Sequence, residues 1–388
     1  MAISDYMAEM ENSASLIRKM FEEGIKLKQQ FGNDNVFDFS IGNPVVPPTK
    51  AFKAALLETA EDPNLSHGYM PNPGYADVRE IIAKGITCEQ GVTVTDKNVI
   101  MTCGAAGALN IFMKAVINPG DEVIIPVPCF MEYKYYCENV SAKAVFVPTA
   151  ADFDLDVNKI VQSITAKTKI ILLNSPNNPT GKIYSEGALR QLADVLVKQH
   201  PGIFLLCDEP YHHLSYGKKV PGIFSIYPNA VVATSYSKDM SLPGERIGYL
   251  AINPNMTDAA RVFNAATVAN RILGFINAGA FIQKVCAKCY DQFVDVSIYE
   301  KKRDLLAGVL AHAGYQFDLP EGAFYFFVKS PIADDVGFCD ILRNHKILAV
   351  PGKGFSYPGF FRLAYCCSDT AITGSAGGFQ KAIQEAGK

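Results

Sequence analysis

Short apolar runs alternate with helical stretches through the middle of the chain. Between Val99 and Ile252 these runs are rich in β-branched residues and too short for buried helices. They occupy residues 99–102, 122–125, 144–147, 170–173, 203–206, 230–233 and 248–251. Strands that alternate with helices are typical of βαβ units, so the pattern predicts an α/β fold with a mostly parallel sheet flanked by helices.

The two ends of the chain have a different pattern. Five apolar residues recur at helical spacing near the start, and Gly32 ends the predicted helix: Leu16, Ile17, Met20, Phe21 and Ile25. After about residue 285, a long helical stretch precedes apolar runs at 324–328, 347–350 and 361–365. We therefore predict a large domain over residues 41–285 and a smaller α+β domain over 286–388, which the N-terminal segment 1–40 joins.

Composition narrows the class of protein. The 388 residues are 49% hydrophobic and 19% charged, which is ordinary for a globular enzyme. The net charge of -3 argues against nucleic acid or an anionic membrane as a partner, and no apolar run approaches the roughly 18 residues of a spanning helix. The N-terminus lacks the features of a signal peptide, and the ten cysteines mostly lie in apolar runs. We expect a cytoplasmic protein with reduced thiols and no metal site.

A lysine between two predicted strands is the first candidate for chemistry. Lys238 follows the run at 230–234 and precedes the run that starts at Ile247. Burial lowers the pKa of a lysine and makes its amine a nucleophile towards carbonyls. Ser235, Ser237 and Arg246 supply the hydroxyls and the guanidinium that bind a phosphate ester. Together they suggest pyridoxal phosphate (PLP), whereas the alternative is a solvated loop with ordinary charges.

Polar residues also follow other predicted strands. Residues 103–110 form a small-residue turn that opens a helix, which indicates either an anion site or tight helix–sheet packing. Asp208 leaves a buried run, and burying a carboxylate is costly unless it has a partner such as a pyridinium N–H. Ligands of open α/β sheets bind at the carboxyl ends of the strands, where these residues lie.

The combined motifs resemble the class I/II aminotransferases of PLP fold type I. The residues that carry the resemblance appear in the family's order and spacing: Asn178 in the Asn-Asn-Pro-Thr-Gly segment, Asp208-x-x-Tyr211, Ser235-x-Ser237-Lys238, Arg246 and Phe361-Arg362-Leu363. The resemblance extends from Gly42 to Arg362. It implies the fold type I architecture, PLP as the cofactor, and amino acids and 2-oxo acids as substrates.

The resemblance also implies a role for each cofactor-binding residue. Lys238 forms the Schiff base and later moves the substrate proton, while Asp208 pairs with the pyridine nitrogen. Asn178 and Tyr211 bind the ring 3-oxygen, and Phe130 stacks on the ring where relatives often have Tyr or Trp. The phosphate ligands are Ser235, Ser237, Arg246 and the backbone at Ala105 and Ala106.

Substrate and subunit contacts follow from the same resemblance. Arg362 binds the substrate α-carboxylate, with help from the Gly42 backbone and Asn178. Tyr69 reaches the phosphate of the neighbouring subunit, which implies a homodimer with shared active sites.

We therefore predict an aminotransferase that works by ping-pong half-reactions. The predicted donor has a neutral side chain, apolar or aromatic, because Ala106 stands where some acid-specific relatives have lysine. Arg271 offers a counterargument, since its segment could approach the neighbouring site. Two alternatives stay open: a C–S β-lyase on the same fold, and a non-catalytic sensor of the kind found in some transcription regulators.

Overall fold

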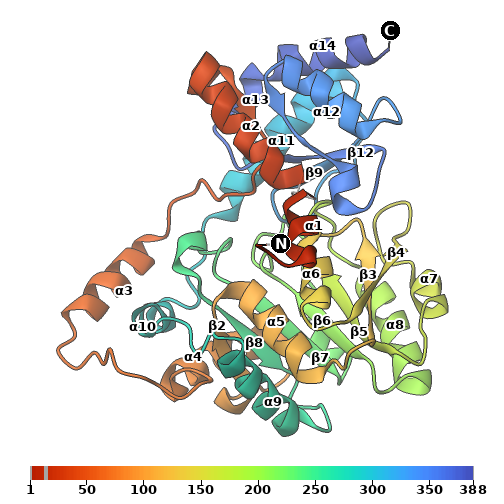
Figure 1. Ribbon diagram of the computed structural model, residues 1–388. Coiled ribbons are helices and arrows are strands. Elements are labelled where there is room, and N and C mark those ends of the chain that lie inside the picture. Colours follow the sequence, from red (N-terminus) through yellow and green to blue (C-terminus); the bar gives the residue numbers. More distant parts are fainter. Residues whose placement is uncertain (1, 13–15, 388) are drawn as a thin grey trace.

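A seven-stranded sheet forms the larger part of the molecule (Figure 1). The structure, a computed structural model, describes residues 2–12 and 16–387. The strand order is β2-β8-β7-β6-β5-β3-β4, and only β8 runs antiparallel to its neighbours. The bounds are β2 Val99–Thr102, β3 Glu122–Val127, β4 Lys143–Pro148, β5 Thr168–Asn174, β6 Phe204–Asp208, β7 Ala230–Ser235 and β8 Gly248–Ile252. All seven predicted strands and the mostly parallel sheet are confirmed.

Helices cover both faces of this sheet because its strands bury side chains on both sides. Ile124 of β3 packs in one core, whereas its neighbours Val123 and Ile125 pack in the other. The first face is covered by α3 (Lys50–Glu61), α4 (Ala76–Gln90), α7 (Val157–Gln162), α8 (Glu186–Gln199) and α10 (Ala280–Lys288). The second face is covered by α5 (Gly104–Val116), α6 (Glu132–Glu138) and α9 (Ala259–Ile272).

A second, smaller core lies beside the large sheet. It contains an antiparallel sheet of β11 (Val350–Pro351), β12 (Phe360–Ala364) and β9 (Tyr325–Lys329), and a parallel pair of β1 (Phe37–Asp38) and β10 (Ile347–Leu348). Its helices are α11 (Val296–Ala313), α12 (Asp335–Asn344), α13 (Asp369–Gly374) and α14 (Ala376–Ala386). The run predicted at 347–350 is two strands, because β10 pairs with β1 and β11 pairs with β12. The domain boundaries given above stay a prediction.

The N-terminal segment forms two helices that lie in different places. α2 (Leu16–Phe31) lies beside the small core, where the Lys28 ammonium is 2.6 Å from the Asp38 carboxylate. α1 (Asp5–Asn12) lies instead near α6 of the large part, and the Tyr6 hydroxyl donates a 2.8 Å hydrogen bond to Glu138 (Figure 1). Within segment 1–40, α2 therefore contacts the small part and α1 contacts the large part, and the assignment of the segment to a domain stays a prediction. The side chains of Leu16, Ile17 and Phe21 lie outside the described part of the predicted apolar face.

The described residues include no candidate membrane-spanning helix and no candidate metal-binding group. Within residues 2–12 and 16–387, no helix combines the length and hydropathy that crossing a membrane requires. The same ranges contain no group of His, Cys, Asp and Glu side chains arranged to hold a metal ion. Cys286 and Cys289 are buried free thiols at the C-terminal end of α10.

Candidate active site

A cavity of about 1190 Å³ opens at the carboxyl ends of β5, β6 and β7. These strands are parallel, so their last residues Asn174, Asp208 and Ser235 meet at one edge of the sheet. The cavity brings together every predicted site residue except Tyr69: Gly42, Ala105, Ala106, Phe130, Asn178, Asp208, Tyr211, Ser235, Ser237, Lys238, Arg246 and Arg362. Residues that are far apart in the sequence therefore form one site.

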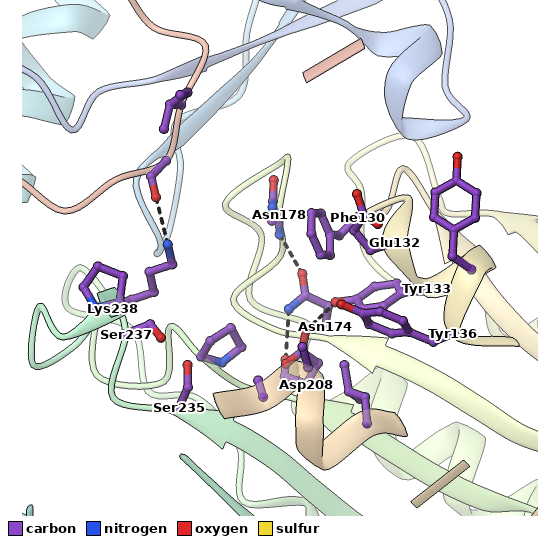
Figure 2. A pocket seen from close by; sticks show the side chains of 18 of the residues that line it. Phe130, Glu132, Tyr133, Tyr136, Asn174, Asn178, Asp208, Ser235, Ser237 and Lys238 are labelled. Atoms are coloured by element: carbon purple, nitrogen blue, oxygen red, sulfur yellow. Dashed lines mark hydrogen bonds between the residues drawn. The ribbon is translucent and has the colours of Figure 1, made fainter. Parts of the chain in front are cut away.

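Lys238 lies in the loop after β7 and points into this cavity (Figure 2). Its Nζ donates a 2.8 Å hydrogen bond to the Gly42 carbonyl. Burial lowers the pKa of Lys238 to about 8, and the positive charges of Arg362 and Arg246 act in the same direction. The amine is thus much more available as a nucleophile near neutral pH than that of an exposed lysine.

Three kinds of donor suited to a phosphate gather beside Lys238. The hydroxyls of Ser235 and Ser237 make no hydrogen bond with any residue in the described ranges (Figure 2). α5 begins at Gly104 and turns its free N-terminal N–H groups, including those at Ala105 and Ala106, towards the cavity. A Cβ at Gly104, where φ is +74°, would lie 3.0 Å from Nη2 of Arg246. The arginine therefore packs directly against the helix start, and the cluster is suited to an anion.

Asp208 is held by a tyrosine that the sequence analysis did not assign to the site. The Tyr133 hydroxyl donates a 2.5 Å hydrogen bond to Oδ2 of Asp208, and Asn174 donates to the Asp208 backbone carbonyl (Figure 2). Oδ1 of Asp208 is buried and has no hydrogen-bond partner among the described residues. Burial raises the pKa of Asp208 to about 7, although the Tyr133 hydrogen bond opposes this. Oδ1 therefore lacks a hydrogen-bond donor within the described chain, and a cationic ring N–H would supply one.

Arg362 is buried on β12 and faces the cavity from the small sheet. Its Nη1 donates a 3.0 Å hydrogen bond to Oδ1 of Asn178, and its Nη2 donates a 2.6 Å bond to the Ser40 carbonyl. Nε has no partner in the described part of the chain. The guanidinium carbon also lies 4.6 Å from the ring centre of Tyr325. This oriented cation retains donors for a carboxylate ligand.

Tyr325 is a second residue that the sequence analysis missed, because it lies within an apolar strand. Its hydroxyl is 2.9 Å from that of Tyr211. A Cβ at Gly42 would collide with the same hydroxyl, which explains why this loop position needs glycine. Tyr325 therefore joins the Gly42 loop to the turn that carries Tyr211.

Phe130 lines the cavity, whereas Tyr69 lies outside it. Phe130 lies at the cavity wall beside Asn178 and in edge contact with Tyr133, at 5.7 Å between ring centres (Figure 2). Tyr69 is 100% exposed and does not line this chain's cavity. The position of Tyr69 leaves it available to another chain.

The residues of the cavity fit PLP. Asp208 offers an unpaired buried oxygen to a ring N–H, Phe130 offers an apolar wall, and Lys238 offers an amine of lowered pKa. The free hydroxyls of Ser235 and Ser237 complete the set with donors for a phosphate.

Comparisons with known proteins agree with this geometry. The family model of aminotransferase class I and II matches residues 34–374. A crystal structure of an aminotransferase from Eubacterium rectale is 36% identical and superposes with a TM-score of 0.96, covering 100% of both chains. A probable aspartate aminotransferase of Methanocaldococcus jannaschii is 30% identical over 361 residues, or 90% of this chain and 92% of the relative. An asparagine–oxo-acid transaminase of Streptococcus mutans is 30% identical over 379 residues, or 94% of each chain.

The fold, the lysine-centred cavity and these similarities lead to one conclusion. The chain belongs to aminotransferase class I and II, and it is a PLP-dependent aminotransferase of fold type I that transfers an amino group between an amino acid and a 2-oxo acid.

Proposed function

We propose that the preferred amino donor has a neutral side chain and is not aspartate. The observation that carries this proposal is the set of cations in the cavity. Among the described residues that line it, only Lys238, Arg246 and Arg362 are basic. Each of them is already engaged: Lys238 with the Gly42 carbonyl, Arg246 with the Pro243 carbonyl, and Arg362 with Asn178. A second substrate carboxylate therefore has no cation left to pair with in this chain, and an unpaired buried charge is costly.

The proposed roles assign one task to each group. PLP, when bound, supplies an aldehyde that condenses with amines and a ring that takes up electrons. Arg362 binds the donor's α-carboxylate and orients its Cα–H towards Lys238. The Lys238 amine takes the Cα proton on Nζ and later returns it, a task for which a pKa near 8 is well suited. Asp208 keeps the facing ring N–H protonated, and Tyr211 supplies a hydroxyl donor to the ring oxygen.

We also propose that the enzyme is a homodimer in which Tyr69 completes the partner's site. A tyrosine that is 100% exposed buries none of its ring area in the single chain. Apolar side chains around the turn after α9 are exposed as well, including Ile272 and Ile276. Exposed apolar surface of this kind is typical of a protein interface.

Similarity alone does not choose the donor. The Methanocaldococcus jannaschii relative, one of several named for aspartate, and the relative named for asparagine are each 30% identical to this chain. Those two amino acids have nearly the same shape and differ in side-chain charge. The cavity's charges, rather than overall identity, therefore support the choice of a neutral donor.

The test compares kcat/KM for aspartate with kcat/KM for alanine, leucine and phenylalanine. 2-Oxoglutarate is the acceptor, and both glutamate and pyruvate are followed so that β-elimination is also detected. Arg271→Ala is measured in parallel, because Arg271 is exposed at the end of α9 and could serve a neighbouring site. We expect a neutral donor to be preferred in both proteins. A lead of more than about tenfold for aspartate, or roughly 1.4 kcal/mol, that disappears in Arg271→Ala would refute the proposal.

A further inference from the structure

A carboxylate without a partner lies in the wall of the active-site cavity. Glu132 is the first residue of α6 and lies beside Phe130, two residues earlier (Figure 2). Its side chain is half-buried, and it makes no hydrogen bond or ion pair with any residue that the structure describes. The carboxylates of Glu11 and Glu22 line the same cavity from α1 and α2.

Glu132 lies among aromatic side chains of the cavity wall, including Phe130 and Tyr136 (Figure 2). Burial raises its pKa, which shows that the charged form has lost water without gaining a cation. Tyr136, one turn along α6, has its pKa raised by burial and also by the charge of Glu132. The negative charge of Glu132 therefore acts on groups in the cavity with little screening by water.

The catalytic machinery of the cavity does not use Glu132. Asp208 is the carboxylate held by Tyr133 at the strand ends, and the three basic residues are engaged as described above. Glu132 has no role in the proposed reaction, but it lines the substrate cavity. Its carboxylate can therefore attract or repel polar groups of a ligand bound there.

We propose that Glu132 determines specificity by reading the end of the donor side chain. It favours a neutral side chain that ends in a hydrogen-bond donor, such as a carboxamide, and it disfavours a carboxylate. A carboxylate in this cavity meets like charge at reduced dielectric constant, whereas an N–H group provides the partner that Glu132 lacks. This inference rests on the proposed function and deepens it, because it names the residue that excludes acidic donors and the class of side chain that it selects.

Two isosteric pairs of amino acids isolate this effect. Asparagine and aspartate differ only in the amide or acid at the end of the side chain, and so do glutamine and glutamate. The amide/acid ratio of kcat/KM is measured for each pair in the wild type, Glu132→Gln, Glu132→Lys and Glu186→Gln. Glu186 is a matched control, since it is an exposed carboxylate at the start of α8 and does not line the cavity.

We expect the wild-type ratio to exceed tenfold in favour of the amide. Glu132→Gln should reduce it at least fivefold, Glu132→Lys should invert it, and Glu186→Gln should leave it unchanged. A ratio in Glu132→Gln that stays within twofold of the wild type overturns the proposal.

A binding measurement tests the effect of Glu132 on the preference for amide over acid without requiring turnover. Calorimetry of succinate and its monoamide, succinamate, yields a ratio of Kd values that should follow the same order across the four proteins. If no amino acid supports turnover, the proposed function fails, yet the Kd ratio still decides the role of Glu132. If turnover is normal but both ratios ignore Glu132, only this inference fails.

Discussion

The Lys238 ammonium donates a 2.8 Å hydrogen bond to the carbonyl of Gly42, 196 positions earlier in the chain. Gly42 in turn lies against the Tyr325 hydroxyl, so one contact joins the loop before α3, the end of β7 and the small sheet. The bond holds the amine over the cavity until a ligand takes its place. With a pKa of about 8, about a tenth of the amine is neutral at pH 7, far more than for an ordinary lysine.

We predict that PLP attaches to Lys238 with a rate that rises as the pH passes through about 8. Only the neutral amine attacks the aldehyde, and its fraction increases until the pH exceeds this pKa. Borohydride reduction followed by peptide mapping identifies the labelled residue. Lys238→Ala should bind PLP without a covalent link and lose turnover by orders of magnitude, whereas the exposed Lys198→Ala should resemble the wild type. Label on another lysine would contradict the assignment.

The stability of the cofactor-free protein should fall as the pH rises from 4 to 7. The pKa of Asp208 is about 7 in the folded chain and 3.8 as a reference, so the unfolded chain loses this proton first. Between these values the folded state binds more protons, and the free energy of unfolding decreases with pH, by roughly 4 kcal/mol at most. Denaturant midpoints measured at several pH values report the slope.

Asp208→Asn should flatten this slope because the amide does not titrate. Tyr133→Phe should extend the decrease to higher pH, since the Tyr133 hydrogen bond keeps the pKa of Asp208 lower than burial alone would. Asp194→Asn on the exposed side of α8 provides the control. An unchanged slope in Asp208→Asn would show that other groups cause the pH dependence.

Arg362→Lys should lower kcat/KM for every amino acid by a similar factor, on the order of a hundredfold or about 3 kcal/mol. Lysine keeps the charge but cannot hold Asn178, Ser40 and a substrate carboxylate with one planar fork. Steady-state kinetics with donors of different side chains measure the effect, and Arg343→Lys on the surface of α12 is the control. A loss restricted to one kind of side chain would mean that Arg362 reads the side chain rather than the α-carboxylate.

Mixing two inactive variants should restore activity if subunits share their sites. In a hybrid of Tyr69→Phe with Lys238→Ala, one of the two sites contains both native residues. Subunit exchange should therefore recover up to about a quarter of the wild-type activity when the hybrid forms statistically. Activity is measured over time after mixing, with each variant alone as the control. Complete exchange, confirmed by mass, without any recovery would count against sharing.

The large sheet was predictable because its strands are buried on both faces. Runs such as 99–101 and 230–233 are apolar at every position, and β2 and β7 are buried throughout. The direction of β8 was not predictable in this way, since an apolar run has the same pattern whether it lies parallel or antiparallel to its neighbours. The predicted helix near the N-terminus was found as α2, but α1 has no strong apolar stripe that would separate it from a loop.

The site residues with distinctive chemistry were predictable from their motifs. Lys238, Asp208 and Arg362 are charged residues beside buried runs, so their burial needed an explanation. Tyr133 and Tyr325 were not assigned to the site from the sequence. A tyrosine within an apolar segment is indistinguishable from a core aromatic residue until its hydroxyl partner is known. The sequence shows only that a buried tyrosine hydroxyl needs a hydrogen-bond partner, and it does not identify that partner.

The position of α1 affects how the enzyme should be produced. Tyr6, Met7 and Met10 of this helix line the cavity, and Tyr6 is bound to Glu138 at its edge. An affinity tag fused ahead of α1 therefore adds its residues near the entrance, and a polyhistidine sequence would bring imidazole hydrogen-bond donors near Glu11 and Glu132. The C-terminal helix α14 lies at the far end of the small part (Figure 1). A tag placed there, or one removed by a protease before assay, leaves the measured preference for donors to the protein's own side chains.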